Sequence, residues 1–214
     1  MRVRALTALL LLATAAPLMA QEGGGFAILN GGDTVAVELF ERVDVQLAGN
    51  LIRVAGPTRE RIRYKATLIE DESAPLVEFS VWREDDPPSS PARQIARVIF
   101  KDDSVAVDDA SRSAALTRLF ATERGAIPYL NLSLAFLELA TRRFAASGAD
   151  SLAVPFFNLG GGQTVTGTVR RLGADAASLQ LAGVEFRLTL DRIGRIQGGA
   201  VPSQGLRLVR MPAP

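Results

Sequence analysis

The chain has 214 residues, of which 48% are hydrophobic, and it contains neither histidine nor cysteine. This composition excludes a Ser-His-Asp triad, a cysteine nucleophile, a disulfide framework and an ordinary zinc or copper site. Its formal net charge of +1 predicts no long-range attraction to nucleic acid or to an anionic membrane.

The first 20 residues have the order of a secretory signal peptide. Arg2 and Arg4 precede an uncharged run over residues 5–16, and the segment ends at the small residue Ala20. The alternative is an uncleaved membrane anchor. As a helix, however, the uncharged run would be only about 18 Å long, too short to span a hydrocarbon core of about 30 Å. We therefore expect cleavage after Ala20 and an exported protein, periplasmic or secreted, without a transmembrane anchor. Cleavage would lower the formal net charge to −1.

The first predicted hairpin follows the leader. Apolar and polar residues alternate from Val35 to Leu47, which predicts a strand with its odd-numbered residues facing a core. A two-residue turn at Gly49-Asn50 would place Leu47 opposite Ile52 and keep both on that face. The pattern and the turn residues together predict a hairpin at this dipeptide.

A second hairpin is predicted over residues 59–68 and 77–84, where the alternation resumes. Its outer face carries a basic row with about 6.6 Å between neighbours, made of Arg59, Arg61, Arg63 and Lys65. Two registers keep the apolar residues together. One places Arg61 opposite Glu84, and the other, shifted by two residues, sets the basic row against Glu78, Trp82 and Glu84.

A third hairpin is expected from residues 94–100 and 104–107, with its turn at Asp102-Asp103. Residues 109–125 are ambiguous, and helical turns around residues 114–121 are one interpretation.

Residues 127–146 are predicted to form one long apolar helix. Pro128 stands where a first-turn proline is tolerated, Arg142 and Arg143 lie in the last turns, and Gly148 follows the end. The apolar residues cover more than half of the circumference, so we expect burial on most sides. These residues are Leu130, Leu132, Leu134, Phe136, Leu137 and Leu139.

Strands are predicted to resume after the helix, including a hairpin with a two-residue turn at Ala182-Gly183. We expect a glycine-rich flexible leader at residues 21–32, with a short strand at residues 26–29 as the alternative, and a single β-rich domain at 33–211. The fold class is mainly β (α+β): a large curved antiparallel sheet or half-barrel built of hairpins and covered by the helix near residues 127–146.

This organisation resembles the half-barrel carriers of the bacterial envelope, such as periplasmic lipoprotein carriers and related uncharacterised secreted β-rich proteins. The resemblance rests on the signal peptide, the long hairpins, the central helix and the returning strands over residues 33–210. It implies a curved sheet whose helix covers a space for a hydrophobic molecule, and it assigns no functional residue.

Two groups of residues are candidate binding sites. On the helix, Leu130, Leu134, Phe136 and Leu137 either form the core or line a cavity for a lipid or another hydrophobic molecule. On the basic row, Arg61 and Arg63 beside Trp82 either form a solvated, charge-paired sheet face or grip an anionic group.

Acidic clusters fall at predicted turns, where solvated Asp and Glu are common. They are Glu70-Asp71-Glu72, Asp85-Asp86, Asp102-Asp103 and Asp108-Asp109. Calcium binding and carboxylate catalysis are the alternatives, but neighbouring residues of a strand point to opposite faces, which disfavours a catalytic pair. We predict no metal and no cofactor.

Three functional hypotheses follow. The first is a non-enzymatic envelope protein that binds a hydrophobic or amphipathic ligand between sheet and helix. The second is an envelope structural or protein-interaction module that uses the basic face at residues 59–65 or a strand edge. The third is a hydrolase that works with carboxylates alone. The sequence favours a non-enzymatic role and does not name the ligand or the oligomeric state.

Overall fold

The computed structural model describes residues 21–213 except residues 56, 88 and 112–115. The predicted signal peptide at residues 1–20 lies outside the described residues, so it stays a prediction.

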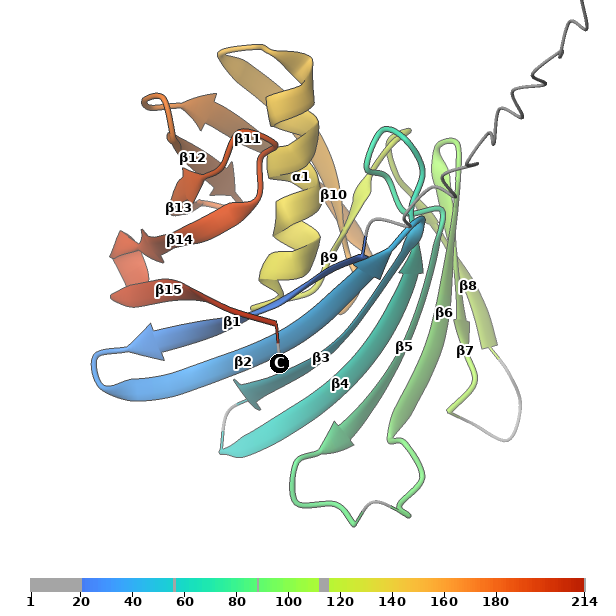
Figure 1. Cartoon of the computed structure of the whole chain (residues 1–214). Coiled ribbons are helices and arrows are strands. Elements are labelled where there is room, and N and C mark those ends of the chain that lie inside the picture. The colour runs from blue at the N-terminus through green and yellow to red at the C-terminus, as the bar shows by residue number, and fades with distance from the viewer. Residues whose placement is uncertain (1–20, 56, 88, 112–115, 214) are drawn as a thin grey trace, which may run out of the picture.

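The described chain forms one 15-stranded sheet and the α-helix α1 (Leu134–Ser147) (Figure 1). The strand order is β8-β7-β6-β5-β4-β3-β2-β1-β15-β14-β13-β12-β11-β10-β9, and the neighbours are antiparallel except β9 and β10. The first eight strands are β1 (Gln21–Asn30), β2 (Asp33–Val43), β3 (Gln46–Ala55), β4 (Thr58–Thr67), β5 (Leu76–Arg83), β6 (Gln94–Lys101), β7 (Ser104–Asp109) and β8 (Leu116–Ala121). The others are β9 (Ile127–Tyr129), β10 (Ser151–Asn158), β11 (Gln163–Arg171), β12 (Ala176–Leu181), β13 (Val184–Leu190), β14 (Ile196–Val201) and β15 (Leu206–Met211), with the short 3-10 helix η1 (Pro202–Gln204) before the last.

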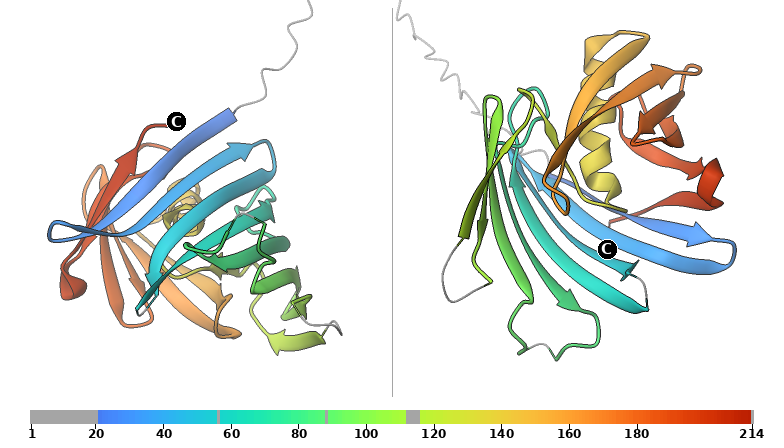
Figure 2. Two further views of the ribbon diagram at one scale, coloured as in Figure 1. Left: turned by 90° about the horizontal axis from the view of Figure 1, so that it is seen from below. Right: turned by 180° about the vertical axis from the view of Figure 1, so that it is seen from behind.

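The sheet curls around α1 without closing. Strand β15 pairs with β1, so the N-terminal and C-terminal halves of the sheet join along these two strands. The helix lies between the two halves (Figure 2). The ends of the strand order, β8 and β9, are not hydrogen-bonded to each other. Side chains bridge the opening instead: Phe120 packs on Phe157 with 5.8 Å between ring centroids, and Thr164 donates to Thr122 at 2.8 Å.

The concave face of the sheet and α1 share one core. Phe26 and Phe40 stack with centroids 5.5 Å apart, and Tyr64 packs on Phe136 of the helix at 4.8 Å. The inner residues of most strands are fully buried. Burial of this apolar face is the main favourable contribution to folding.

Three local predictions are confirmed. The chain turns at Asp102-Asp103 between β6 and β7, and at Ala182-Gly183 between β12 and β13. The second hairpin also forms, but the register with Arg61 opposite Glu84 is wrong. The strands adopt the pairing shifted by two residues, with Arg61 opposite Trp82 and Arg63 opposite Ser80.

The prediction of a long apolar helix at residues 127–146 is wrong. The helix starts at Leu134, has 14 residues and buries Glu138, Thr141 and Arg142 among its apolar side chains. Pro128 lies in β9, which pairs with β10 in parallel. Leu132 has a φ of 67°, which a continuing helix does not allow. The C-terminal end is confirmed, because Gly148 caps the helix in the left-handed conformation.

The first hairpin was also predicted wrongly. The chain turns at Asp44-Val45, and Gly49 and Asn50 lie inside β3. The even-numbered residues of β2 face the core, and the odd-numbered residues face outwards. Both faces of this strand carry apolar side chains, so alternation alone did not decide which face is inside.

Two further segments differ from expectation. Residues 21–32, expected as a flexible leader, contain β1, which pairs with β2 on one side and β15 on the other. Within the ambiguous stretch at 109–125, residues 116–121 form strand β8 instead of helical turns, while residues 112–115 lie outside the described residues.

The ring of Tyr64 lies directly against the backbone of Gly49, its cross-strand partner on β3. A Cβ atom at this position would lie 2.3 Å from ring atoms of Tyr64, which is buried and cannot move aside. We expect Gly49→Ala to lower the free energy of unfolding by about 1–3 kcal/mol, measured by urea denaturation. Gly32→Ala is the matched control, because a Cβ there meets nothing within 4 Å. Equal stability of the two variants would contradict this packing.

Candidate functional site

A buried carboxylate holds the first turn of α1. Glu38 points inwards from β2, and its Oε2 accepts hydrogen bonds from the backbone N–H groups of Leu134 at 2.8 Å and Ala135 at 2.9 Å. Its Oε1 accepts from Ser133 Oγ at 2.5 Å and from the Tyr64 hydroxyl at 2.8 Å. The positive end of the helix dipole and four donors thus replace water around this carboxylate.

Burial dominates the acid–base behaviour of this group. It raises the pKa of Glu38, and the hydrogen bonds from Ser133, Ala135, Tyr64 and Leu134 only partly oppose this effect. Burial, together with the charge of Glu38, also raises the pKa of Tyr64 well above its usual value. The tyrosine therefore stays a donor to Glu38 over the physiological pH range.

A second carboxylate joins the middle of the helix to the sheet. Glu138 accepts from Arg142 Nη2 at 3.1 Å, Arg210 Nη1 at 2.6 Å and the backbone N–H of Ile196 at 2.9 Å. Arg142 also pairs with Glu22 of β1. These contacts connect α1 with β1, β14 and β15, the strands at which the two halves of the sheet meet.

Contacts near the end of the helix complete its attachment. Thr141 Oγ1 donates to the carbonyl of Gly194 at 2.7 Å. Arg143 donates from Nε to the carbonyl of Asp71 and from Nη1 to that of Gly125, each at 2.7 Å. The helix is thus bound to loops on both halves of the sheet.

The space between helix and sheet is almost filled. A cavity of about 40 Å³ remains there, lined by Leu134, Leu137, Val184 and Phe186 among others. Small-molecule sites usually measure about 300–1,000 Å³, and 40 Å³ holds little more than a water molecule. Any larger ligand at this place would have to displace the helix.

The four apolar candidates from the sequence lie in this core. Leu134, Phe136 and Leu137 belong to α1, whereas Leu130 belongs to the segment between β9 and the helix, and all four are buried. Their role as ligand contacts stays a prediction.

The polar candidates come together on the outer face of the sheet, opposite the helix. The Arg61 guanidinium lies 5.3 Å from the centroid of the Trp82 ring, and that of Arg63 lies 5.7 Å from it. Trp82 Nε1 donates to the carbonyl of Ser90 at 3.2 Å, which fixes the ring. We call these three residues the Arg–Trp cluster.

Charge compensation differs along the basic row. Arg59 pairs with Glu84 at 3.0 Å, and Lys65 lies opposite Glu78 in the register. Within the described residues, Arg61 and Arg63 have no ion pair with a carboxylate, and the buried Nε of Arg61 donates no hydrogen bond. The cluster therefore carries two uncompensated positive charges.

A hollow of about 490 Å³ adjoins the cluster on the same face. Its lining includes the basic residues Arg63, Lys65 and Arg97 and the acidic residues Glu78 and Asp108. Glu78 lies 3.9 Å from Arg97, so the charge of the hollow is mixed and Arg63 is the cation beside the cluster.

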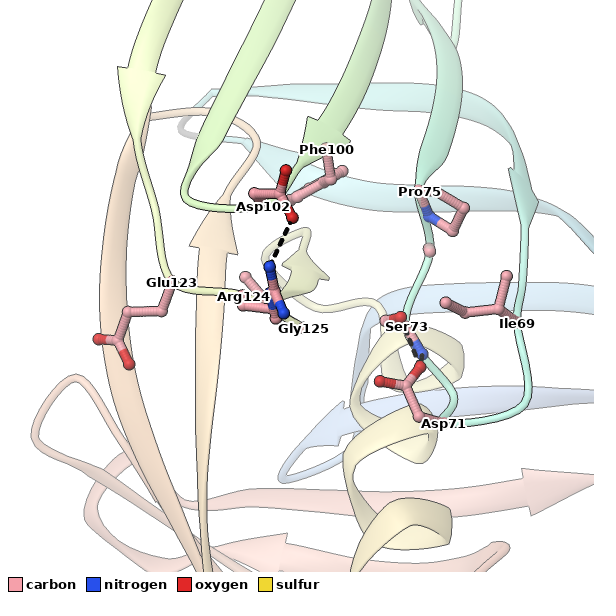
Figure 3. Close-up of a pocket in the computed structure, with 11 residues that line it drawn as sticks. Ile69, Asp71, Ser73, Pro75, Phe100, Asp102, Glu123, Arg124 and Gly125 are labelled. Carbon is pink, nitrogen blue, oxygen red and sulfur yellow. Dashed lines mark hydrogen bonds and ion pairs between the residues drawn. The ribbon is translucent and has the colours of Figure 1, made fainter.

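Another pocket, of about 300 Å³, contains three carboxylates (Figure 3). Asp102 pairs with Arg124 at 2.8 Å, Asp71 accepts from Ser73, and Glu123 points away from both. Burial would raise the pKa of Asp71, but the hydrogen bonds from Ser73 outweigh it and lower this pKa. These three carboxylates do not form the facing pair that glycoside hydrolysis uses.

The described residues offer neither a metal cluster nor a membrane-spanning helix. Across residues 21–213 apart from the gaps, no cluster of three or more acidic residues could hold a metal ion. No helix in this part of the chain is long and apolar enough to cross a membrane.

Comparison with known proteins supports the fold and does not assign a function. No protein-family model matches the chain, and no curated protein matches its sequence. A DUF1089 family protein from Pseudomonas aeruginosa has a similar structure, with a TM-score of 0.57 and 14% identity over 81% of this chain and 92% of the other. A β-barrel-like protein of the domain of unknown function DUF1849, from Brucella abortus, has a TM-score of 0.54 and 10% identity over 90% and 95%.

Sequence reasoning missed the residues that position the helix. Glu38 and Glu138 are ordinary acidic residues in the sequence, and their partners lie up to 97 positions away. Ser133 did offer a signal, because serine is a preferred N-cap and the helix begins directly after it. It would have corrected the predicted start at residue 127.

Substitution of Glu38 separates its charge from its hydrogen bonds. We expect Glu38→Leu to cost about 3 kcal/mol or more, because it leaves buried donors of Ser133, Tyr64 and the helix unsatisfied. We expect Glu38→Gln to cost less, because its amide oxygen can still accept from the backbone and both hydroxyls can accept from its NH₂ group.

The pH dependence follows from the raised pKa of Glu38. Its contribution to stability is full below the unfolded pKa of about 4.5 and decreases as the pH rises through the folded pKa. As the pH rises through this range, the wild type should therefore lose stability that Glu38→Gln does not lose. The difference between their free energies of unfolding, measured by urea denaturation at several pH values, should change in favour of Glu38→Gln. A constant difference across that range would refute the raised pKa.

Proposed function

We propose that this protein is a non-enzymatic binding module of the bacterial envelope, and that it recognises an anionic partner through the Arg–Trp cluster. The observation that carries this proposal is the pair Arg61 and Arg63, which share the ring of Trp82 and have no carboxylate partner in the described part of the chain. Guanidinium groups held on an aromatic ring are pre-oriented and less hydrated, which favours carboxylate and phosphate groups.

The arrangement of the interior supports an outer site. Glu38 and Glu138 hold α1 against the sheet, and the remaining cavity of about 40 Å³ is too small for an acyl chain. A ligand between helix and sheet would have to break these buried contacts. Binding at the cluster requires no such rearrangement.

Trp82 makes the proposal directly testable, because it is the only tryptophan of the chain. Poly-L-glutamate, titrated at low ionic strength, should change the fluorescence of Trp82 in a saturable manner. The response should weaken as salt is added, because the site is exposed to solvent. Arg61→Gln combined with Arg63→Gln should reduce the affinity by about tenfold or more.

The matched control is Arg118→Gln combined with Arg192→Gln. It removes the same charge from two exposed arginines that lie outside the cluster, and it should leave the titration unchanged. An absent response at low salt, or an equal loss in both double variants, would overturn the proposed function.

A further inference from the structure

An apolar belt crosses the outer face beside the Arg–Trp cluster. Cross-strand pairing arranges it in two rows that each end at an arginine of the cluster. One row runs Val209, Ala27, Val37, Ile52 and Arg61, and the other runs Met211, Gly25, Leu39, Asn50 and Arg63. We call the apolar residues of these rows on β15, β1, β2 and β3, together with Val54, the apolar belt; the exposed polar residue Asn50 separates Leu39 from Arg63 in the second row.

The core does not require the belt. On β2 the opposite face already supplies the buried residues Ala36 and Phe40, whereas Leu39 is 40% exposed. On β3, Val54 is 42% exposed although Leu51 fills the core. Val37, Ile52, Val209 and Met211 on the same face are partly buried, so partly accessible apolar surface continues across these strands. Apolar surface on a sheet face that needs no further packing is typical of an interaction surface.

Positive charge stands at both ends of the belt. Arg61 and Arg63 lie at the β4 end, and Arg207 lies exposed at the β15 end with no ion pair to any described residue. Glu41 lies beside the belt on β2 and accepts a hydrogen bond from Gln21. Glu78 and Glu84 lie beside the cluster on the same face, where they face Arg97 and Arg59. The excess of positive charge complements an anionic surface.

We infer that the belt and the cluster together dock the protein on the surface of an anionic lipid bilayer. Apolar side chains can enter the boundary between headgroups and acyl chains while arginines reach the lipid phosphates and Trp82 lies at headgroup depth. This inference rests on the proposed function, because it uses the same two arginines. A second copy of the chain fits less well, since a twofold contact through this face would bring the same positive charges together.

The test is co-sedimentation of the protein, purified after export, with vesicles of 70% phosphatidylcholine and 30% phosphatidylglycerol at 0.1 M salt. Pure phosphatidylcholine vesicles are the comparison. We expect binding to the anionic vesicles that weakens with salt and is much weaker on the neutral ones. This wild-type comparison stands whether or not any variant folds.

Two variants separate the contributions. Arg61→Gln with Arg63→Gln should lower the partition coefficient on anionic vesicles by about 30-fold. Leu39→Thr with Val54→Thr keeps strand-forming residues and should lower it by about tenfold, without changing the fluorescence response to poly-L-glutamate. The control Arg118→Gln with Arg192→Gln should bind vesicles like the wild type.

The outcomes distinguish the two proposals. Vesicle binding that fails while the poly-L-glutamate response persists overturns the bilayer inference and leaves an acidic protein segment as the partner. Failure of both overturns the proposed function as well. Equal binding to neutral and anionic vesicles also overturns the inference. So does an unchanged partition coefficient of the variant Leu39→Thr with Val54→Thr on anionic vesicles.

Discussion

The fold depends on two carboxylates that are buried between the sheet and α1 and need hydrogen-bond donors there. A carboxylate removed from water is costly unless donors surround it, and Glu38 finds its donors at the start of α1. Glu138 finds its partners on β14 and β15. Together they fix the helix in position and orientation relative to both halves of the sheet. The buried face of β2 follows from the same requirement, because Glu38 must point towards the helix.

The attached helix fills most of the space on the concave face of the sheet. With α1 in place, the concave face is a packed core whose remaining cavity is about 40 Å³. The molecule therefore differs from a carrier with an open interior, although its sheet is similar to β-barrel-like proteins of unknown function. The Arg–Trp cluster and the apolar belt lie on the outer face of the sheet, away from this core. They lie side by side because β3 and β4 are neighbours.

Local signals predicted local structure. The hairpins at Asp102-Asp103 and Ala182-Gly183 followed from short turns between matched apolar faces, and the basic row was placed correctly on one face of β4. The failures were non-local. The inner face of β2 was chosen wrongly because Val35, Val37 and Leu39 form the more regular pattern. The donors that face Glu38 at the start of α1 lie up to 97 residues further along the chain.

The helix illustrates the same limit. Apolar residues before Leu134 follow helical spacing, but Ile127–Tyr129 forms a strand that pairs with β10. No pattern of neighbouring residues in the sequence predicts this pairing. Likewise the glycine-rich start of the chain becomes a strand because β15 is available beside it. The Arg–Trp cluster could be proposed from sequence since both strands belong to one hairpin, whereas the apolar belt spans strands from both ends of the chain.

If α1 is a fixed part of the core and not a lid, its amides should be as well protected as those of the sheet. Native-state hydrogen exchange of the amides of residues 134–147, followed by mass spectrometry, measures this protection. We expect the hydrogen-bonded amides in the middle of the helix to exchange only through global unfolding, with the same free energy as the central strands of the sheet. Exchange of the whole helix through an opening of much lower free energy, while β2 and β15 stay protected, would contradict this expectation.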